Sequence, residues 1–187
     1  MSTSSVGRPG KYQRSAGGLL AALVITVVAI GALLWFMGLF RDDVDNRPDR
    51  VDYLETVSEA QDAKLSPIYP AELPKGWIAT GFDVVPGDNP TFEIRLLTDS
   101  DKFIGIRQEA EDVSTLIRQY VDEDASATDI YSARGSVAEA WQGYEDDGGD
   151  SAYASEVDGE TVLVYGSASA ADLREVIDSL TTEALDD

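Results

Sequence analysis

Residues 151–180, SAYASEVDGETVLVYGSASAADLREVIDSL, give the clearest indication of fold class in the chain. The Asp-Gly pair at 158–159 is a strong signal for a two-residue hairpin turn. The pattern on either side of it predicts strands over 151–157 and 160–165. Because the TVLVY segment is apolar on both faces, we expect the second strand to lie in the centre of a sheet.

A helix is predicted directly after this strand. Ser169 and Asp172 have the spacing of a capping box, in which the side chains and backbone groups at the start of a helix satisfy each other. Apolar residues then recur at helical spacing, at Leu173, Val176, Ile177 and Leu180. One face of this helix is therefore apolar, and we expect it to pack on the sheet.

Four further strands are predicted upstream. Alternating apolar and polar residues, bounded by turn residues, indicate strands at 77–85, 92–96, 102–108 and 137–144. The first three are joined by short turns, which is typical of antiparallel pairing.

Two further helices are predicted. One begins at an Asp49 N-cap and ends by Ser66, and the other follows an Asp112 N-cap. The residues between the second helix and 137 are expected to form a loop. The predicted fold class is therefore α+β, with an antiparallel β-sheet that has helices packed on one face.

Composition excludes several classes of chemistry. The 187 residues include no cysteine and no histidine, which removes disulfides, thiolate sites and the usual neutral-pH general base. All 35 acidic residues follow residue 40, whereas three of the 14 basic residues precede it. Such an acidic domain repels phosphate backbones, so no nucleic-acid partner is expected. No cofactor is expected either.

The N-terminal region predicts a membrane anchor. Residues 15–40 form a run of 26 uncharged residues, which is longer than the apolar part of a signal peptide and long enough to span a bilayer. Arg14 precedes the run and Arg41 follows it, and Trp35 and Phe36 would lie at the outer interface. The excess of basic residues before the run predicts a cytoplasmic N-terminus and an extracytoplasmic C-terminal domain at the plasma membrane.

The expected domain organisation follows from these patterns. Residues 1–14 form a cytoplasmic tail, 15–40 a single transmembrane helix and 41–48 a linker. Residues 49–183 form the extracytoplasmic α+β domain, and 184–187 form an acidic C-terminal tail. The bilayer is thus the first expected partner, and an envelope protein is a second.

One acidic turn is a weak candidate for a cation site. Asp146, Asp147 and Asp150 lie in EDDGGD between two predicted strands, and calcium prefers several carboxylate oxygens on a flexible loop. The spacing does not match an EF-hand. An ordinary solvated turn is the favoured interpretation.

Aromatic residues gather in the second half of the chain, at Tyr131, Trp141, Tyr144, Tyr153 and Tyr165. An aromatic groove for a sugar or a lipid tail is one interpretation. Core packing and cross-strand pairs are the more frequent use of such residues in strands, and are favoured here.

Several motifs together resemble a known family. They are VDY at 51–53, LPKGW at 73–77, the strand from Trp141 to Tyr144, and the ending VLVYGSASAADLREVIDSL. In order and content they resemble an uncharacterised family of actinobacterial single-pass membrane proteins that carry an extracytoplasmic domain of unknown function. The resemblance implies a cell-envelope protein and implies no activity.

The sequence favours a non-enzymatic, membrane-anchored domain that binds a partner protein or an envelope component. Two alternatives stay open. A carrier or sensor of a lipid-like ligand would need a cavity lined by the sheet-facing apolar residues. An envelope hydrolase would need carboxylates that converge in a cleft.

Overall fold

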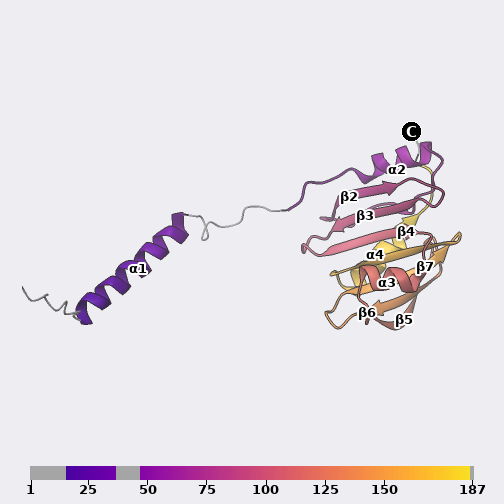
Figure 1. Ribbon diagram of the computed structural model, residues 1–187. Helices are drawn as coiled ribbons and strands as arrows, with labels where there is room; N and C mark the ends of the chain where they lie inside the picture. Colours follow the sequence, from indigo (N-terminus) through magenta and orange to yellow (C-terminus); the bar gives the residue numbers. More distant parts are fainter. Residues whose placement is uncertain (1–15, 37–46, 186–187) are drawn as a thin grey trace, which may run out of the picture. The chain divides into compact units, whose positions relative to one another are not determined.

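The computed structural model describes residues 16–36 and 47–185 (Figure 1). The chain divides between residues 46 and 47 into two units, each of which is described by itself. The first unit contains helix α1 (Ala16–Phe36). Over the part of the chain that the structure describes, no helix combines the length and the apolar character needed to cross a membrane.

The residues predicted to flank the membrane are largely outside this description. Arg14 and Arg41 lie outside the described residues. Trp35 and Phe36 belong to the last turn of α1, for which only the backbone is described. The side chains of α1 are described over residues 23–33, where all are exposed.

The second unit is an α+β domain, which confirms the predicted class. Its main sheet has seven antiparallel strands in the order β2-β3-β4-β8-β7-β6-β5. These strands are β2 (Ile78–Val85), β3 (Thr91–Leu97), β4 (Phe103–Glu109), β5 (Ser126–Ser132), β6 (Ala140–Glu145), β7 (Ser151–Val157) and β8 (Glu160–Gly166). The helices are α2 (Tyr53–Asp62), α3 (Val113–Tyr120) and α4 (Ala170–Ser179). Short strands β1 (Tyr69–Pro70) and β9 (Leu180–Thr181) pair separately.

Strand β8 lies at the centre of the sheet, as predicted from its apolar sequence. It pairs with β4 on one side and with β7 on the other. Val162 and Val164 point into one apolar cluster, and Leu163 and Tyr165 point into another. The strand is buried on both faces because a helix packs against each of them.

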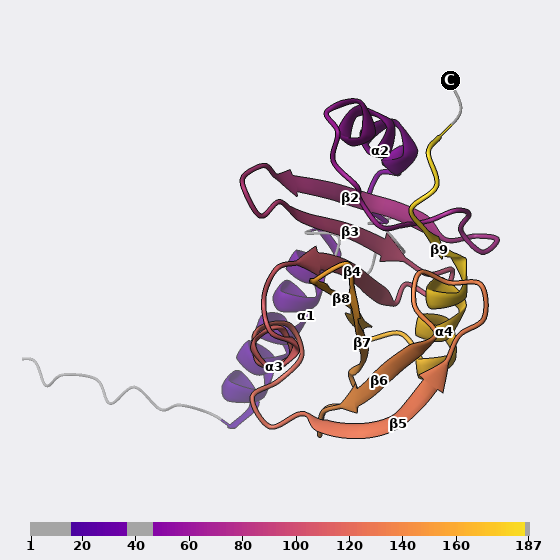
Figure 2. The ribbon, with the colours of Figure 1, turned by 90° about the vertical axis from the view of Figure 1, so that its right-hand side faces the viewer.

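The prediction that the helices pack on one face is wrong. Helices α2 and α4 contribute to the larger cluster, whereas α3 places Leu116 and Ile117 in the smaller cluster on the opposite face. Figure 2 shows α3 and α4 on opposite sides of the sheet. Ala152 and Ala154 of β7 belong to the smaller cluster, and such small side chains allow a helix to approach a sheet closely.

The loop expected before residue 137 contains a strand. Strand β5 pairs with β6 at the edge of the sheet, with an irregular register between Ala127 and Ile130. All of its residues except Tyr131 are exposed. An edge strand with neither face buried lacks the alternating pattern from which strands are predicted.

The predicted N-cap residues of the helices are confirmed in part. Ser169 and Asp172 form the predicted capping box of α4. The N-cap of α2 is Asp52 rather than Asp49, and it accepts a hydrogen bond from the Leu54 N–H at 3.2 Å. Asp112 is the N-cap of α3, although its side chain makes no capping hydrogen bond. Asp49 and Asp52 both precede the helical pattern, so spacing alone did not distinguish them.

The C-terminal residues remain attached to α2. Gln61 donates to the Glu183 carbonyl at 2.9 Å and accepts from the Leu185 N–H at 3.0 Å. The Tyr69 hydroxyl donates to the same Glu183 carbonyl at 2.7 Å.

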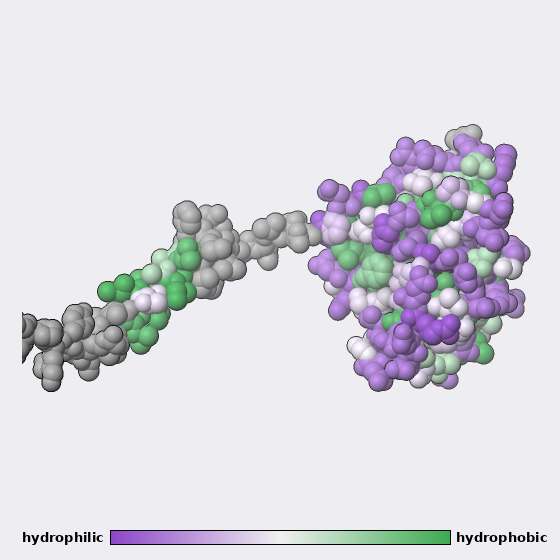
Figure 3. All heavy atoms as spheres, viewed as in Figure 1, coloured by the Kyte–Doolittle hydropathy of each residue, from purple (hydrophilic) through white to green (hydrophobic). Residues whose placement is uncertain are grey.

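The surface of the domain is mainly hydrophilic, as Figure 3 shows for one face.

Candidate functional site

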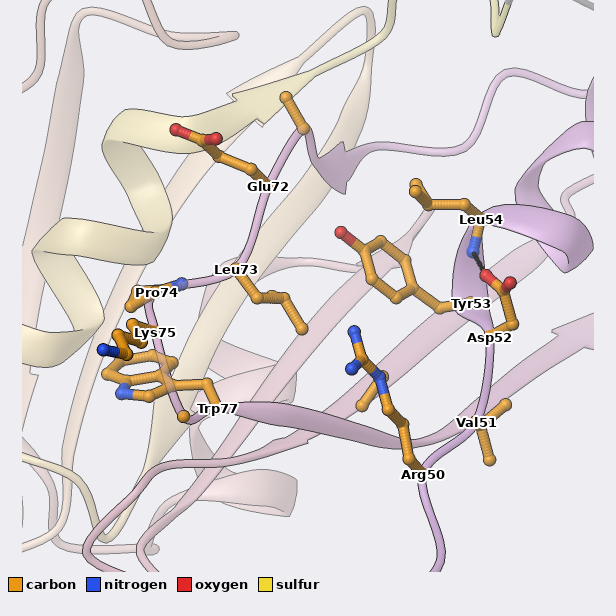
Figure 4. Close-up of a pocket in the computed structure, with 13 residues that line it drawn as sticks. Arg50, Val51, Asp52, Tyr53, Leu54, Glu72, Leu73, Pro74, Lys75 and Trp77 are labelled. Carbon is orange, nitrogen blue, oxygen red and sulfur yellow. Dashed lines mark hydrogen bonds between the residues drawn. The ribbon is translucent and has the colours of Figure 1, made fainter.

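A pocket of about 640 Å³ opens beside the start of the folded domain (Figure 4). Residues 50–54, which lead into α2, form part of its wall. Residues 71–77, which contain the LPKGW turn, form most of the rest. Leu73 points toward the middle of the space between Tyr53 and Trp77. The pocket therefore lies where the chain enters the domain.

Arg47 holds the two walls together. Its Nη2 donates to the Gly76 carbonyl at 2.9 Å and to the Thr98 carbonyl at 3.0 Å. Four residues later, the Val51 N–H donates to the Ala79 carbonyl at 2.8 Å. The entering segment is thus bonded both to the turn and to β2, so the pocket has a defined shape in the unliganded domain.

The turn itself requires glycine at Gly76. Its φ angle is +89°, in the left-handed region that side chains disfavour. A Cβ atom there would lie 3.1 Å from the Asp99 Cβ. The Trp77 N–H donates to the Pro74 carbonyl at 3.1 Å, which closes the turn and directs Trp77 toward the core.

Tyr53 and Trp77 form a buried floor. They are 6% and 7% exposed. The Tyr53 hydroxyl donates to the Pro70 carbonyl at 2.8 Å. Burial, reinforced by nearby Tyr69 and Asp52, raises the pKa of Tyr53 to about 12. The hydroxyl is therefore protonated at neutral pH, and its proton is used in the hydrogen bond that fixes the ring.

The two acids of the pocket are directed elsewhere. Asp52 caps α2 through its hydrogen bond with the Leu54 N–H. Glu72 also lines a second hollow, together with Glu175 and Asp178 of α4, and in Figure 4 its carboxylate points toward the α4 ribbon. The two carboxylates do not point toward each other across the pocket.

Of the four charged side chains of the pocket, only that of Asp52 makes a hydrogen bond or an ion pair with a residue that the structure describes. Neither Arg50 nor Lys75 makes a hydrogen bond or an ion pair with any residue that the structure describes. The Arg50 side chain extends into the pocket toward Tyr53 and Leu73 in Figure 4. The lining thus combines charged side chains of both signs with an apolar floor, which suits the pocket to a ligand that has both polar and apolar parts.

The core between the sheet and α4 is filled. Ile94, Ile106 and Val164 face this layer and are at most 2% exposed. The cavity that a lipid-like carrier needs in this layer is therefore occupied by side chains. The pocket instead lies at the entry to the domain, with a lining that is partly charged.

The proposed cation turn is closed by its own backbone. Asp146 Oδ1 accepts from the Asp150 N–H at 2.7 Å, and the Asp146 N–H donates to the Asp150 carbonyl at 3.1 Å. Asp147, between them, is exposed. Within residues 16–36 and 47–185, no group of three or more acidic residues is placed to hold a metal ion.

The aromatic residues do not form one groove. Trp141 and Tyr153 are buried in the larger cluster, with Tyr131 packed against it. Tyr144 and Tyr165 belong to the smaller cluster on the other face. The favoured core interpretation is thus confirmed for Trp141 and Tyr153.

Family comparison covers both units of the chain. A model for a protein family of unknown function, DUF4245, matches residues 11–180. The chain belongs to the DUF4245 family. Comparison with curated proteins gives no match. The match to DUF4245 includes all of the pocket-lining residues and supplies no activity for the domain.

The pocket of this DUF4245 protein was not predicted from its sequence. LPKGW was recognised as a turn, but Arg50 and Lys75 are separated by 25 positions and belong to different predicted elements. The available signal was the position of Lys75 in a rigid turn before a buried tryptophan. The contacts of Arg47 with Gly76 and of Val51 with Ala79 help to bring the two segments to one pocket.

Proposed function

We propose that this chain is a non-enzymatic, membrane-anchored binding protein, and that its extracytoplasmic domain binds an envelope component in the pocket beside Arg50 and Lys75. The pocket is the observation that carries the proposal. It combines charged side chains of both signs with an apolar floor on a domain whose core is filled. The pocket has no serine, threonine, cysteine or histidine among its lining residues.

The membrane anchor is supported by sequence. The 26 uncharged residues from Ser15 to Phe40 match the length of a bilayer span. Arg8, Lys11 and Arg14 before the run favour a cytoplasmic N-terminus. The exposure of Ile25 and Val28 on α1, 68% and 64%, is what a lipid-facing helix requires. The resemblance to actinobacterial single-pass proteins favours the same placement.

Single-cysteine labelling tests the topology, because the natural chain has no cysteine. Ser4→Cys places a thiol before the apolar run, and Ser126→Cys places one on exposed β5. A membrane-impermeant maleimide applied to intact cells should label the Ser126→Cys variant alone. It should label the Ser4→Cys variant only after permeabilisation. The opposite labelling, or a mature N-terminus after Phe40, would refute the proposed topology.

Site-specific photocrosslinking tests the binding site. A photoreactive amino acid at Leu73 points into the pocket, whereas one at Asp147 lies on the exposed β6–β7 turn. In intact cells we expect a discrete adduct at Leu73 that is absent at Asp147. Identical adducts at both positions would indicate collision at the surface rather than binding in the pocket.

A further inference from the structure

The two edges of the main sheet differ in what borders them. Strand β2 forms one edge, where the entering segment bonds to it through the Val51 N–H and the Ala79 carbonyl. Strand β5 forms the opposite edge and pairs with β6 alone (Figure 2). Among the described residues, no other segment forms a backbone hydrogen bond with β5. The outer side of β5 is therefore open to an added strand.

The hydrogen bonds with β6 determine which residues of β5 face outward. The Ala133 N–H donates to the Glu139 carbonyl at 3.0 Å, and the pairing from Ser132 back to Ile130 is regular. Successive residues of an antiparallel strand bond alternately to opposite sides. Tyr131 therefore bonds inward to β6, whereas Ile130 and Ser132 direct their N–H and carbonyl groups outward. These two residues offer main-chain donors and acceptors to a partner.

The regular part of β5 lacks the features that usually protect an exposed edge. Charged residues, especially lysine, as well as proline and bulges are the common means of preventing edge pairing. Strand β5 contains neither lysine nor proline, and its one charged residue, Asp129, lies in the irregular part of the register, which ends at Ile130. Ile130 is also 62% exposed. A neighbouring strand would therefore cover apolar surface in addition to making backbone hydrogen bonds.

The charge around this edge indicates the chemistry of the partner. Residues 122–145, which include β5 and β6, contain six exposed acidic residues and one basic residue, Arg134. The acidic residues are Asp122, Glu123, Asp124, Asp129, Glu139 and Glu145. None of these seven charged residues forms an ion pair with a residue that the structure describes. A basic segment would be attracted to this edge, whereas a second copy of the chain would bring the same excess of negative charge.

We propose that the outer edge of β5 binds an extended, basic segment of a partner protein, which adds a strand to the seven-stranded sheet. Ile130 and Ser132 supply the backbone hydrogen bonds, and the surrounding carboxylates attract the basic side chains. The pocket lies beside β2, at the opposite edge of the sheet. The inference thus adds a second binding surface and does not depend on the pocket.

Hydrogen exchange at single amides, measured by NMR on the full-length chain in a neutral detergent, tests the inference. In the chain alone, we expect fast exchange at Ile130 and Ser132 and slow exchange at Tyr131 and Ala133, which bond to β6. The probe is an octapeptide of alternating lysine and valine, and the matched control has glutamate in place of lysine. The lysine peptide should slow exchange at Ile130 and Ser132 by at least about tenfold, because each amide gains a backbone hydrogen bond. The glutamate peptide should not slow it.

The other outcomes contradict the inference in different ways. Equal protection by the glutamate peptide would overturn the basic character of the partner. Protection that increases with protein concentration in the absence of peptide would identify the occupant as a second copy of the chain. If the lysine peptide binds without slowing exchange at Ile130 and Ser132, the attraction is to the acidic surface alone and strand addition is wrong. Absence of binding would also overturn the inference.

A proline variant tests the role of the edge backbone without a change in charge. Ser132→Pro removes an outward N–H but no hydrogen bond to β6, and proline is tolerated at such edge positions. Ser132→Val keeps the N–H and is the matched control. Fluorescence anisotropy of the labelled lysine peptide should show binding at least about tenfold weaker for Ser132→Pro and nearly unchanged for Ser132→Val. Equal affinities would overturn the inference. Because the exchange experiment uses the natural chain, it decides the question even if Ser132→Pro does not fold.

Discussion

Glu93 and Arg107 lie opposite each other on β3 and β4, with 2.8 Å between the glutamate Oε2 and the arginine Nη1. The Arg107 Nε donates to Glu109 at 2.7 Å, and its guanidinium lies 4.4 Å from the centre of the Tyr120 ring. Tyr120 belongs to α3, so this charged ladder lies on the α3 face. Ion pairs there replace the apolar contacts that α3 makes farther along the sheet, at β7 and β8.

The first prediction concerns this ladder. Glu93→Gln should lower the free energy of unfolding by about 1 to 2 kcal/mol, because Arg107 is largely buried and loses a charged partner. Urea denaturation measures the change. Asp83→Asn, which removes the exposed partner of Arg95, should cost less than about 1 kcal/mol. Equal losses would show that burial does not increase the contribution of the Arg107–Glu93 pair to the free energy of unfolding.

The second prediction compares two helix caps. Ser169→Ala should cost about 1 kcal/mol, because the Ser169 hydroxyl accepts from the Asp172 N–H at 3.2 Å in a complete capping box. Asp112→Ala should cost less, since the Asp112 side chain makes no capping hydrogen bond. Thermal or urea unfolding of both variants checks the order. A larger loss for Asp112→Ala would contradict the structure.

The third prediction concerns alkaline pH. Burial raises the pKa of Tyr53 from 10.0 to about 12, so between these values the unfolded chain loses this proton while the folded chain keeps it. The contribution of Tyr53 to stability is therefore complete below pH 10 and is lost as pH rises toward 12. Tyr53→Phe should flatten the fall in unfolding free energy over this interval. Denaturation at several alkaline pH values measures the slope, and an unchanged slope would contradict the assignment.

The fourth prediction concerns the entering segment. Arg47→Gln removes the guanidinium contacts with Gly76 and Thr98. The Val51 amide, bonded to Ala79, should then exchange faster by roughly tenfold, because local opening becomes easier by about 1 to 2 kcal/mol. Arg134→Gln, at an exposed cation without hydrogen bonds to the described residues, is the control. Equal exchange in the two variants would mean that Arg47 does not hold the segment.

Local patterns account for the elements that were predicted correctly. The 158–159 turn, the apolar β8 and the Ser169 cap are each specified by a few adjacent residues, and each appears where expected. Strand β5 and the side of the sheet on which α3 packs depend instead on distant partners. Neither the exposed sequence of β5 nor the apolar stripe of α3 contains information about which surface it will meet.

The candidate site shows the same division. The turn before Trp77 and the closed turn at Asp146 follow from glycine, proline and aspartate residues that act locally. The pocket depends on the segments of Arg50 and Lys75 lining the same space, which requires the folded sheet and the contacts of Arg47. Unpaired charge is likewise a property of three-dimensional neighbours, so composition identified an acidic domain without revealing a pocket that also contains two cations.

The central position of β8 has a consequence for biogenesis. Strand β4 cannot acquire its inner neighbour until residues near Tyr165, which pairs with Gly105, have been synthesised. Strands β2, β3 and β4 therefore cannot join the rest of the sheet until β8 has been synthesised. Pairing between segments so distant in sequence slows folding. If the chain is exported in the orientation we propose, we expect most of the domain to cross the membrane before its sheet can close.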